Sequence, residues 1–444
     1  MSSANLTELT TRNTARLLWE YSLPAIVGML VVSLYNIVDR IFIGHAVGPE
    51  AIAGLTITFP VMNISTAVGV LVGVGASART SILLGNKNLR GAEIILGNTL
   101  VLTILNATVY LSIFTIFMDD ILLAFGASDV TLPYAHEFLT YFLPGLMLMN
   151  VMYSLNNVMR SSGYPRLAMT TMLIGAGCNI ILAPIFIFLL EMGIKGAAIA
   201  SDISLLIGTW FVLTHFMKKN STVHFTSGTF RLRWKEVWSM VALGAAPSIV
   251  NIAGCFINVV INNTLLREGG DNAVAAAGIF TTITAMLVSV VIGLCQGMQP
   301  IVGYNYGAGQ PKRAKKVYWY AVGASTVVCA IGCIAGLTIP QYIAGLFTND
   351  APLIGVSQNA LSIAMTCFWM VGFQIVSTSL FQSLGKAAMS IFLGLTRQVI
   401  FLIPLLLILP TLYGLNGVWA SFPISDLLAT IVTIILVYTV LRRL

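Results

Sequence analysis

The sequence predicts an all-α integral membrane protein of twelve transmembrane helices, arranged as two parallel six-helix bundles related by a pseudo-twofold axis along the membrane normal. Three observations support this prediction: a low charge content, twelve apolar segments of spanning length, and a repeat that relates the two halves of the chain. Of the 444 residues, 57% are hydrophobic and only 9% are charged, whereas about a quarter are charged in ordinary soluble domains. A chain of this composition has too little polar surface for a water-soluble globule.

Twelve apolar segments reach the length that is needed to cross a membrane. About 20 helical residues span a hydrocarbon core about 30 Å thick, and a spanning segment must satisfy its own backbone hydrogen bonds, so each segment is predicted to be a helix. The first follows a polar leader and has ordinary spanning length, so we expect it to be retained rather than cleaved as a secretory signal. The spans are predicted at residues 17–44, 51–80, 92–117, 134–159, 167–190, 194–217, 236–265, 273–306, 317–340, 355–383, 387–410 and 414–440.

Basic residues predict the orientation of the chain in the membrane. Nineteen of the 23 Lys and Arg residues fall near the two ends of the chain and in alternate loops, among them Arg160 and Arg166 after the fourth span. The opposite loops carry acidic residues such as Asp119 and Asp350. Cytoplasmic loops are enriched in Lys and Arg, so both termini are expected in the cytoplasm. The net charge of +7 then reflects topology and contact with anionic membrane lipids rather than nucleic-acid binding.

The two halves of the chain repeat each other. SLPAIV at residues 22–27 aligns with AAPSIV at 245–250, and GIKGAAIAS at 193–201 aligns with GLNGVWASF at 414–422, at an offset that stays between 220 and 224 residues. Each half has six spans, an even number, so both halves cross the membrane in the same sense and enclose a central cavity. The expected organisation is a first lobe at residues 1–217, a cytoplasmic linker at 218–235 and a second lobe at 236–444.

Polar groups at membrane depth in the first half predict an ion-coupling site. A charged side chain at the centre of a bilayer costs about 2.5–3.5 kcal/mol on insertion scales, so such a residue is a functional hypothesis by default. Asp39, Asn179 and Asp202 fall in one outer layer of this half and can together hold a cation or a proton. Tyr35 and Asn36 share the helix face of Asp39. The alternative is that Asp39 only marks the end of a shorter helix.

The second half carries a different set of polar groups. Asn262 occupies the position of Asp39, and an amide does not titrate, so ion coupling is expected mainly in the first half. Arg397 and Asp426 both fall near mid-membrane on consecutive spans, which predicts either a structural ion pair or an arginine that lines the cavity. Single Met and aromatic residues in membrane helices usually serve packing, but they can also supply a soft apolar surface. The residues expected at the substrate cavity are Tyr35, Met62, Phe256, Asn258, Gln296, Met298, Gln299, Trp369, Gln374 and Arg397.

Two prolines are candidates for conformational hinges. Pro24 and Pro247 lie at matching places in the first helix of each half. A proline inside a helix removes one hydrogen bond and bends the axis.

No motif points to catalysis or to a resident cofactor. The chain has no GxSxG or HExxH motif and no phosphate-cradling loop, so neither an enzyme nor a cofactor is expected. Na⁺ at Asp39 is the one metal ion that we consider. The six cysteines all lie inside predicted spans, where free cysteine packs as a small hydrophobe.

Several stretches together resemble a known family. They are SLPAIVGMLVVSLYNIVDRIFIG in the first span, RSSGYPR after the fourth, NIILAPIFIF running into GIKGAAIAS, QPIVGYNYGAG at the end of the eighth, and RQVIFLIPLLLILP with GVWASFPISD near the C-terminus. In this order they are similar to the multidrug and toxic compound extrusion (MATE) family, most closely to its bacterial drug-efflux branch. The resemblance covers nearly the whole chain.

The resemblance implies an antiporter in the bacterial plasma membrane. Such a protein expels small organic compounds and drugs, often cationic or aromatic, in exchange for H⁺ or Na⁺, by rocking of two lobes, and is expected to function as a monomer. Asp39 matches the coupling carboxylate of the family, and Asn179, Asn157 and Ser201 match other polar members of the same site. A flippase of a lipid-linked precursor or polysaccharide on the same scaffold is the alternative.

One departure from the family pattern affects the site. The family usually has Asp before the proline of the fifth helix, where this chain has Ala183. A site with one carboxylate fewer is expected to hold Na⁺ less well and to favour protons. Asp202 follows Ser201 and can restore the charge, although it is rotated about 100° around the helix. Our hypothesis is that Asp39 and Asp202 jointly bind the coupling ion.

Overall fold

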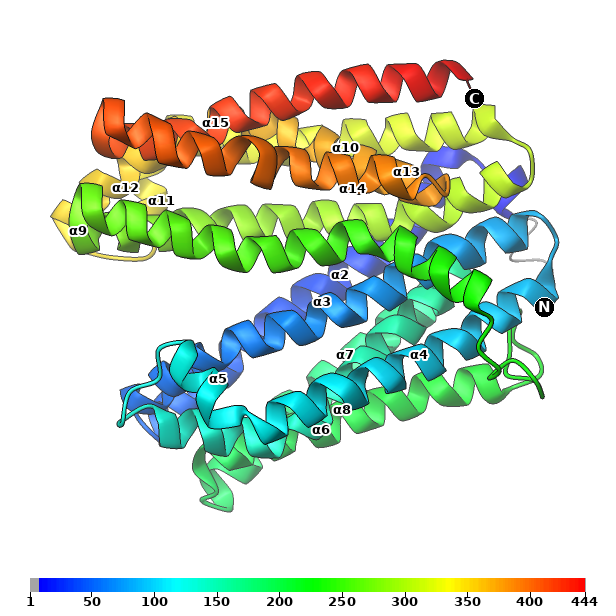
Figure 1. Cartoon of the computed structure of the whole chain (residues 1–444), viewed down its shortest axis with the longest axis horizontal. Coiled ribbons are helices and arrows are strands. Elements are labelled where there is room, and N and C mark those ends of the chain that lie inside the picture. Colours follow the sequence, from blue (N-terminus) through cyan, green and yellow to red (C-terminus); the bar gives the residue numbers. More distant parts are fainter. Residues whose placement is uncertain (1–7, 444) are drawn as a thin grey trace.

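The computed structural model describes residues 8–443, apart from the side chains of residues 35–37, 40, 41, 44, 45, 49 and 443. Figure 1 shows two bundles of long helices that meet at one end of the molecule and diverge toward the other. No strand occurs among the described residues. The predicted all-α class is therefore confirmed.

The first bundle contains the blue to green helices of the lower half of Figure 1. Asn13 caps its first helix, since the Asn13 side chain accepts hydrogen bonds from the backbone N–H groups of Ala15 and Arg16. The helices are α2 (Thr14–Ala46), α3 (Pro49–Gly85), α4 (Leu89–Ile116), the short α5 (Met118–Ala124), α6 (Leu132–Ser161), α7 (Pro165–Pro184), the π-helical turn η1 (Ile185–Leu189) and α8 (Gly193–Met217).

The second bundle contains the remaining helices, and two of its long helices are broken at a glycine. Gly270 in α9 has a φ of 65° and Gly414 in α15 has a φ of 55°, a region that glycine enters without a Cβ clash. The elements are α9 (Trp234–Gly307), α10 (Pro311–Thr338), α11 (Pro340–Gly345), α12 (Ala351–Ala364), the 3₁₀ turn η2 (Phe368–Met370), α13 (Val371–Ser383), α14 (Ala387–Leu395), the π-helix η3 (Thr396–Leu402) and α15 (Ile403–Arg443).

The number of membrane spans agrees with the prediction. In the described part of the chain nine helices are long and apolar enough to cross a membrane, and a bent pair at residues 351–383 makes a tenth. The breaks at Gly270 and Gly414 divide two of these helices into two spans each. The total is twelve, six in each bundle.

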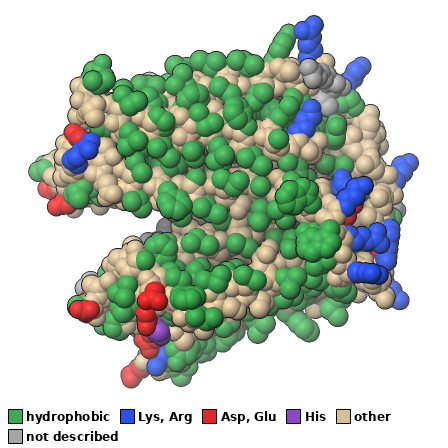
Figure 2. All heavy atoms as spheres, in the orientation of Figure 1, with side chains coloured by type: hydrophobic (Ala, Val, Ile, Leu, Met, Phe, Trp, Pro, Cys, Tyr) green, Lys and Arg blue, Asp and Glu red, His purple; other side chains and the backbone are tan. Residues whose placement is uncertain are grey.

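The space between the bundles is open at only one end of the molecule. Figure 2 shows a deep hollow between them, with acidic side chains around its open end and most Lys and Arg at the closed end. We call the end with Lys87, Lys218 and Lys312 the basic end, and the end with Asp119 and Asp350 the acidic end.

At the basic end the bundles are in backbone contact. A Cβ on Gly75 of α3 would lie 1.9 Å from the carbonyl oxygen of Met240, and a Cβ on Gly244 of α9 would lie 1.8 Å from that of Leu71. Small residues at helix crossings allow backbones to approach this closely. We call this contact region between the bundles the seam.

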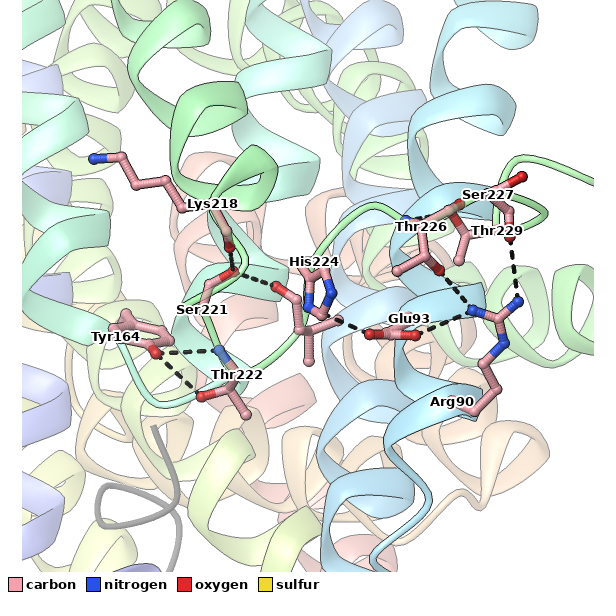
Figure 3. A network of polar contacts seen from close by, with 11 residues as sticks. Arg90, Glu93, Tyr164, Lys218, Ser221, Thr222, His224, Thr226, Ser227 and Thr229 are labelled. Carbon is pink, nitrogen blue, oxygen red and sulfur yellow. Dashed lines mark hydrogen bonds and ion pairs between the residues drawn. The ribbon is translucent and has the colours of Figure 1, made fainter. Parts of the chain in front are cut away.

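The chain that connects the bundles is fixed to the first bundle. Figure 3 shows Arg90 and Glu93 of α4 next to Thr226 and His224 of the linker: Arg90 Nη1 donates to Thr226 Oγ1 at 2.6 Å, and His224 Nδ1 lies 3.3 Å from Glu93 Oε1. Farther along, Asn98 Nδ2 donates to the carbonyl oxygen of Thr229 at 3.1 Å. The linker therefore follows the surface of the first bundle.

Candidate functional site

Three polar side chains from three helices meet in the first bundle. Asn179 of α7 is 2% exposed, and its Nδ2 donates to Oγ of Ser201 in α8 at 2.9 Å. Both side chains are neighbours of the Asp39 carboxylate of α2. We call these residues the Asp39 cluster.

Two acceptor atoms of the Asp39 cluster lack a donor among the described residues. Asp39 Oδ1 and Asn179 Oδ1 are both buried, and within the described residues neither has a hydrogen-bond partner. Buried acceptors without a partner are costly. A proton or a cation with a preference for oxygen ligands would satisfy both atoms, because carboxylate and amide oxygens are suitable ligands for hard cations.

Asp202 lies near the cluster in sequence but faces another helix. It is partly buried on α8, and its carboxylate lies against Gly145 of α6, where a Cβ would come within 1.9 Å of Asp202 Oδ1. That oxygen also has no hydrogen-bond partner among the described residues. The structure thus brings Asp39, Asn179 and Ser201 together and turns Asp202 toward α6.

Other residues that were expected at the coupling site have different surroundings. Asn157 is 3% exposed, and its Nδ2 donates to the backbone carbonyl of Tyr153 at 2.9 Å, on the side of α6 that packs against Gly73 of α3. The side chains of Tyr35 and Asn36 lie outside the described residues. Ala183 is fully buried in the apolar core of the first bundle.

A second polar cluster lies inside the second bundle. Arg397 Nε, in the π-helix η3, donates to Asp426 Oδ1 at 2.6 Å, and the Asp426 side chain is 2% exposed. Gln374 of α13 donates from Nε2 to the backbone carbonyl of Asp426 and to Thr430 Oγ1, both at 2.7 Å. Of the two alternatives from the sequence, the structure forms the ion pair, with the Arg397 side chain 25% exposed.

The residues expected at the cavity differ in exposure. Phe256 and Trp369 are 68% and 43% exposed, Asn258 is exposed, and Met62 is partly buried. Four others are buried in this conformation: Gln296, Met298, Gln299 and Gln374. Met298 packs in the core of the second bundle.

The two predicted hinges lie inside continuous helices. Pro24 is in α2 and Pro247 is in α9. The helix continues on both sides of each proline. A bend at either position therefore leaves the flanking segments helical.

Sequence reasoning did not foresee the position of Arg160. From the sequence we expected Arg160 among the basic residues of a cytoplasmic loop, because it follows the fourth predicted span. In the structure its side chain is buried at the seam and is 3% exposed. No sequence signal distinguishes it from Arg166, which is exposed.

Among the described residues no group of three or more His, Cys, Asp or Glu side chains is placed to hold a metal ion.

Comparison with known proteins identifies the family. The MatE family model matches the chain twice, at residues 24–185 and 246–408. The multidrug export protein MepA of Staphylococcus aureus is 28% identical over 426 residues, which cover 96% of this chain and 93% of that protein. An FAD transporter of Shewanella oneidensis is 27% identical over 423 residues, 93% of this chain and 92% of that protein.

Solved structures share the fold. A crystal structure of MATE in the bent conformation matches with a TM-score of 0.93 at 24% identity, covering 99% of this chain and 98% of that one. An outward-facing conformation of a multidrug resistance MATE family transporter matches with a TM-score of 0.92 at 24% identity, covering 98% of each chain. Two family-model matches in tandem, relatives over nearly the full length and this common fold lead to one conclusion: the chain belongs to the MATE family of membrane transporters.

Proposed function

We propose that the protein is an efflux antiporter that exports small organic compounds, including drugs, in exchange for H⁺ or Na⁺. The observation that carries the proposal is the Asp39 cluster, where a carboxylate oxygen and an amide oxygen are buried at membrane depth and have no hydrogen-bond partner among the described residues. The relative from Staphylococcus aureus, a multidrug export protein, supports organic drugs as the substrate class.

The charges at the two ends of the molecule support one orientation in the membrane. Lys and Arg gather at the basic end, and cytoplasmic surfaces of membrane proteins are enriched in these residues. In our proposal the basic end and both termini face the cytoplasm of a bacterial cell, and the hollow opens to the outside. The lobes at residues 1–217 and 236–444 then rock about the seam, with bending at Pro24 and Pro247.

Coupling rests on the charge of Asp39. A proton or Na⁺ that binds its carboxylate neutralises the charge and lowers the cost of burying it, which allows α2 to repack against α7 and α8. The ion and the drug need only favour different conformations of the lobes to exchange through them. Asp202, whose buried Oδ1 also has no partner among the described residues, supplies the second carboxylate in place of Ala183.

The experiment that tests the proposal is efflux of a cationic dye from proteoliposomes. The pH gradient and the Na⁺ gradient are imposed separately, which also identifies the coupling ion. We expect gradient-driven efflux by the wild type and none by Asp39→Asn, because an amide cannot bind and release a proton. Asp129→Asn, an exposed acidic residue at the acidic end, is the control and should transport normally. Coupled efflux by Asp39→Asn would overturn the mechanism.

A second candidate function is export of anionic organic molecules. The Shewanella oneidensis relative, an FAD transporter, favours it, as does the buried Arg160. A flippase of lipid-linked precursors would also handle anionic substrates. Efflux of a cationic dye and of a flavin nucleotide by the same vesicles separates these candidates.

A further inference from the structure

Arg160 joins the two bundles across the seam. It lies in the last turn of α6, its side chain is 3% exposed, and its Nη1 donates to Oε1 of Gln296 in α9. Nη2 donates to Asn156 Oδ1 at 3.0 Å within α6. One guanidinium group therefore bonds to both bundles at the place where they meet.

The charge of Arg160 has no acidic partner. None of the ion pairs among the described residues includes it, and the side chains outside the described set include no Asp or Glu. A buried cation that is hydrogen-bonded to neutral amides, with the phenol of Tyr153 nearby, carries a desolvation cost of several kcal/mol that no carboxylate compensates. Structural arginines in membrane proteins usually avoid this cost by pairing, so the arrangement calls for a role in another state.

Two buried donors at and near Arg160 have no acceptor among the described residues. The Nε of Arg160 has no hydrogen-bond partner within the described residues, and the buried Nε2 of Gln299, one turn from Gln296, has none either. The Asn156 amide offers one acceptor atom, the Oδ1 that accepts from Arg160 Nη2, while its Nδ2 is a further donor, directed at the carbonyl of Ala168 and at Thr171. The seam around Arg160 thus has an excess of donors and positive charge, which is the complement of an anionic group.

The seam is the part of the molecule that must separate if the hollow is to open at the basic end. Separation breaks the contact between Arg160 and Gln296 and leaves the guanidinium facing the space between the lobes. This step rests on the function proposed above. The guanidinium is planar and matches carboxylate and phosphate groups with two parallel hydrogen bonds.

We propose that Arg160 is a specificity-determining residue that recognises a carboxylate or phosphate group on the substrate at the basic-end entrance. Substrates of this class are organic anions or zwitterions with an aromatic or apolar body. Gln296 holds the guanidinium while the seam is closed, and the anionic group of the substrate takes its place when the lobes part.

The test compares two substrates that differ by a phosphate group. Vesicles with the full-length protein are assayed for transport of flavin mononucleotide and of riboflavin, with ethidium as a third, cationic substrate. We expect the wild type to prefer flavin mononucleotide in kcat/KM. Arg160→Gln should lose about tenfold or more for that substrate, the effect of one charge-assisted hydrogen-bonded pair, while riboflavin and ethidium change less than about twofold. Arg160→Lys keeps the charge but not the planar fork, so its kcat/KM for flavin mononucleotide should fall between those of the wild type and Arg160→Gln.

Arg166→Gln is the matched control. Arg166 is exposed at the start of α7, close in sequence to Arg160 at the end of α6, so this variant should leave all three rates unchanged. Equal losses for all three substrates in Arg160→Gln would show a purely structural role, and no preference for the phosphate in the wild type would also overturn the inference. Ethidium efflux that persists without this preference leaves the proposed antiport intact, whereas wild-type vesicles that transport no substrate under any gradient refute the proposed function.

Discussion

Gly85 of α3 and Gly307 of α9 cross with their backbones in contact at the basic end. A Cβ on Gly85 would lie 2.2 Å from the carbonyl oxygen of Tyr304, and a Cβ on Gly307 would lie 2.3 Å from that of Ile82. Each of these oxygens belongs to the residue three positions before the opposite glycine. Residues 85 and 307 are 222 positions apart, and so are residues 24 and 246, where the two family-model matches begin. The crossing therefore lies on the pseudo-twofold axis.

Gly307→Ala should weaken the closure of the basic end. The added methyl group meets a backbone carbonyl that cannot rotate away, and overpacking of this kind costs about 1–3 kcal/mol, enough to change the ratio of two conformations by about five- to 150-fold. Spin labels at residues 166 and 312, one in each bundle and both exposed, in a cysteine-free background, should report a larger population with separated basic ends. Gly278→Ala is the control, since nothing lies within 4 Å of its Cβ position. Identical distance distributions for both variants would contradict the prediction.

Asp202→Asn should weaken coupling without abolishing it. Among the described residues Asp202 Oδ1 has no hydrogen-bond partner, but it faces Gly145 of α6 rather than the Asp39 cluster, so we expect Asp202 to contribute as a second carboxylate, about tenfold in apparent affinity for the coupling ion. Transport is measured against pH and Na⁺ concentration in vesicles, beside Asp39→Asn. Unchanged dependence on both ions in Asp202→Asn would remove Asp202 from the site.

The pair of Arg397 and Asp426 should be strongly coupled in stability. Removal of one partner of a buried ion pair leaves an uncompensated charge and costs about 3–5 kcal/mol, so Asp426→Asn should lower the free energy of unfolding by an amount toward the lower end of that range, because Arg397 is 25% exposed. The double variant Arg397→Met with Asp426→Leu should lose less than the sum of the single variants. Denaturant unfolding in detergent gives the coupling energy, and additive losses would mean that the pair contributes little.

Exchange of the charges in the inter-bundle pair should restore a broken contact. Arg79 Nε of α3 donates to Glu236 Oε2 of α9 at 3.0 Å, and both side chains are partly exposed, so the pair contributes about 0.2–1 kcal/mol to closure. Arg79→Glu should shift the spin-label distances toward the open basic end, and Arg79→Glu with Glu236→Arg should reverse the shift. The effect should decrease at high salt. A double variant that remains as open as Arg79→Glu would indicate that this pair does not hold the seam.

The sequence predicted the spans better than their contacts. Hydropathy reports how long an apolar segment is, and this length gave twelve helices in the right places. It does not report local register, so the π-helical segments η1 and η3 were not foreseen. Nor does it report where a helix stands relative to the other half, and for this reason Arg160 was placed in a loop.

For the polar residues, too, the sequence predicted position along a helix better than contacts with other helices. The depths of Arg397 and Asp426 could be read from their positions along consecutive helices, and the pairing was one of two alternatives. The meeting of Asn179 with Ser201 at 2.9 Å followed from family resemblance, not from spacing. The rotation of Asp202 toward Gly145 was visible as a difference of about 100° on the helical wheel, but its new neighbour on α6 required the packed structure.

The fixed linker defines how the two lobes can move. Its contacts with α4 extend to the backbone N–H of Arg233, which donates to Asn98 Oδ1 at 2.8 Å, one residue before α9 begins at Trp234. The linker is therefore bonded to the first lobe up to the residue before α9. Large changes of backbone angle are absorbed by a few residues at the end of an element, so in the proposed rocking motion the second lobe would rotate about residues 233–234, and this covalent connection would keep the start of α9 beside α4.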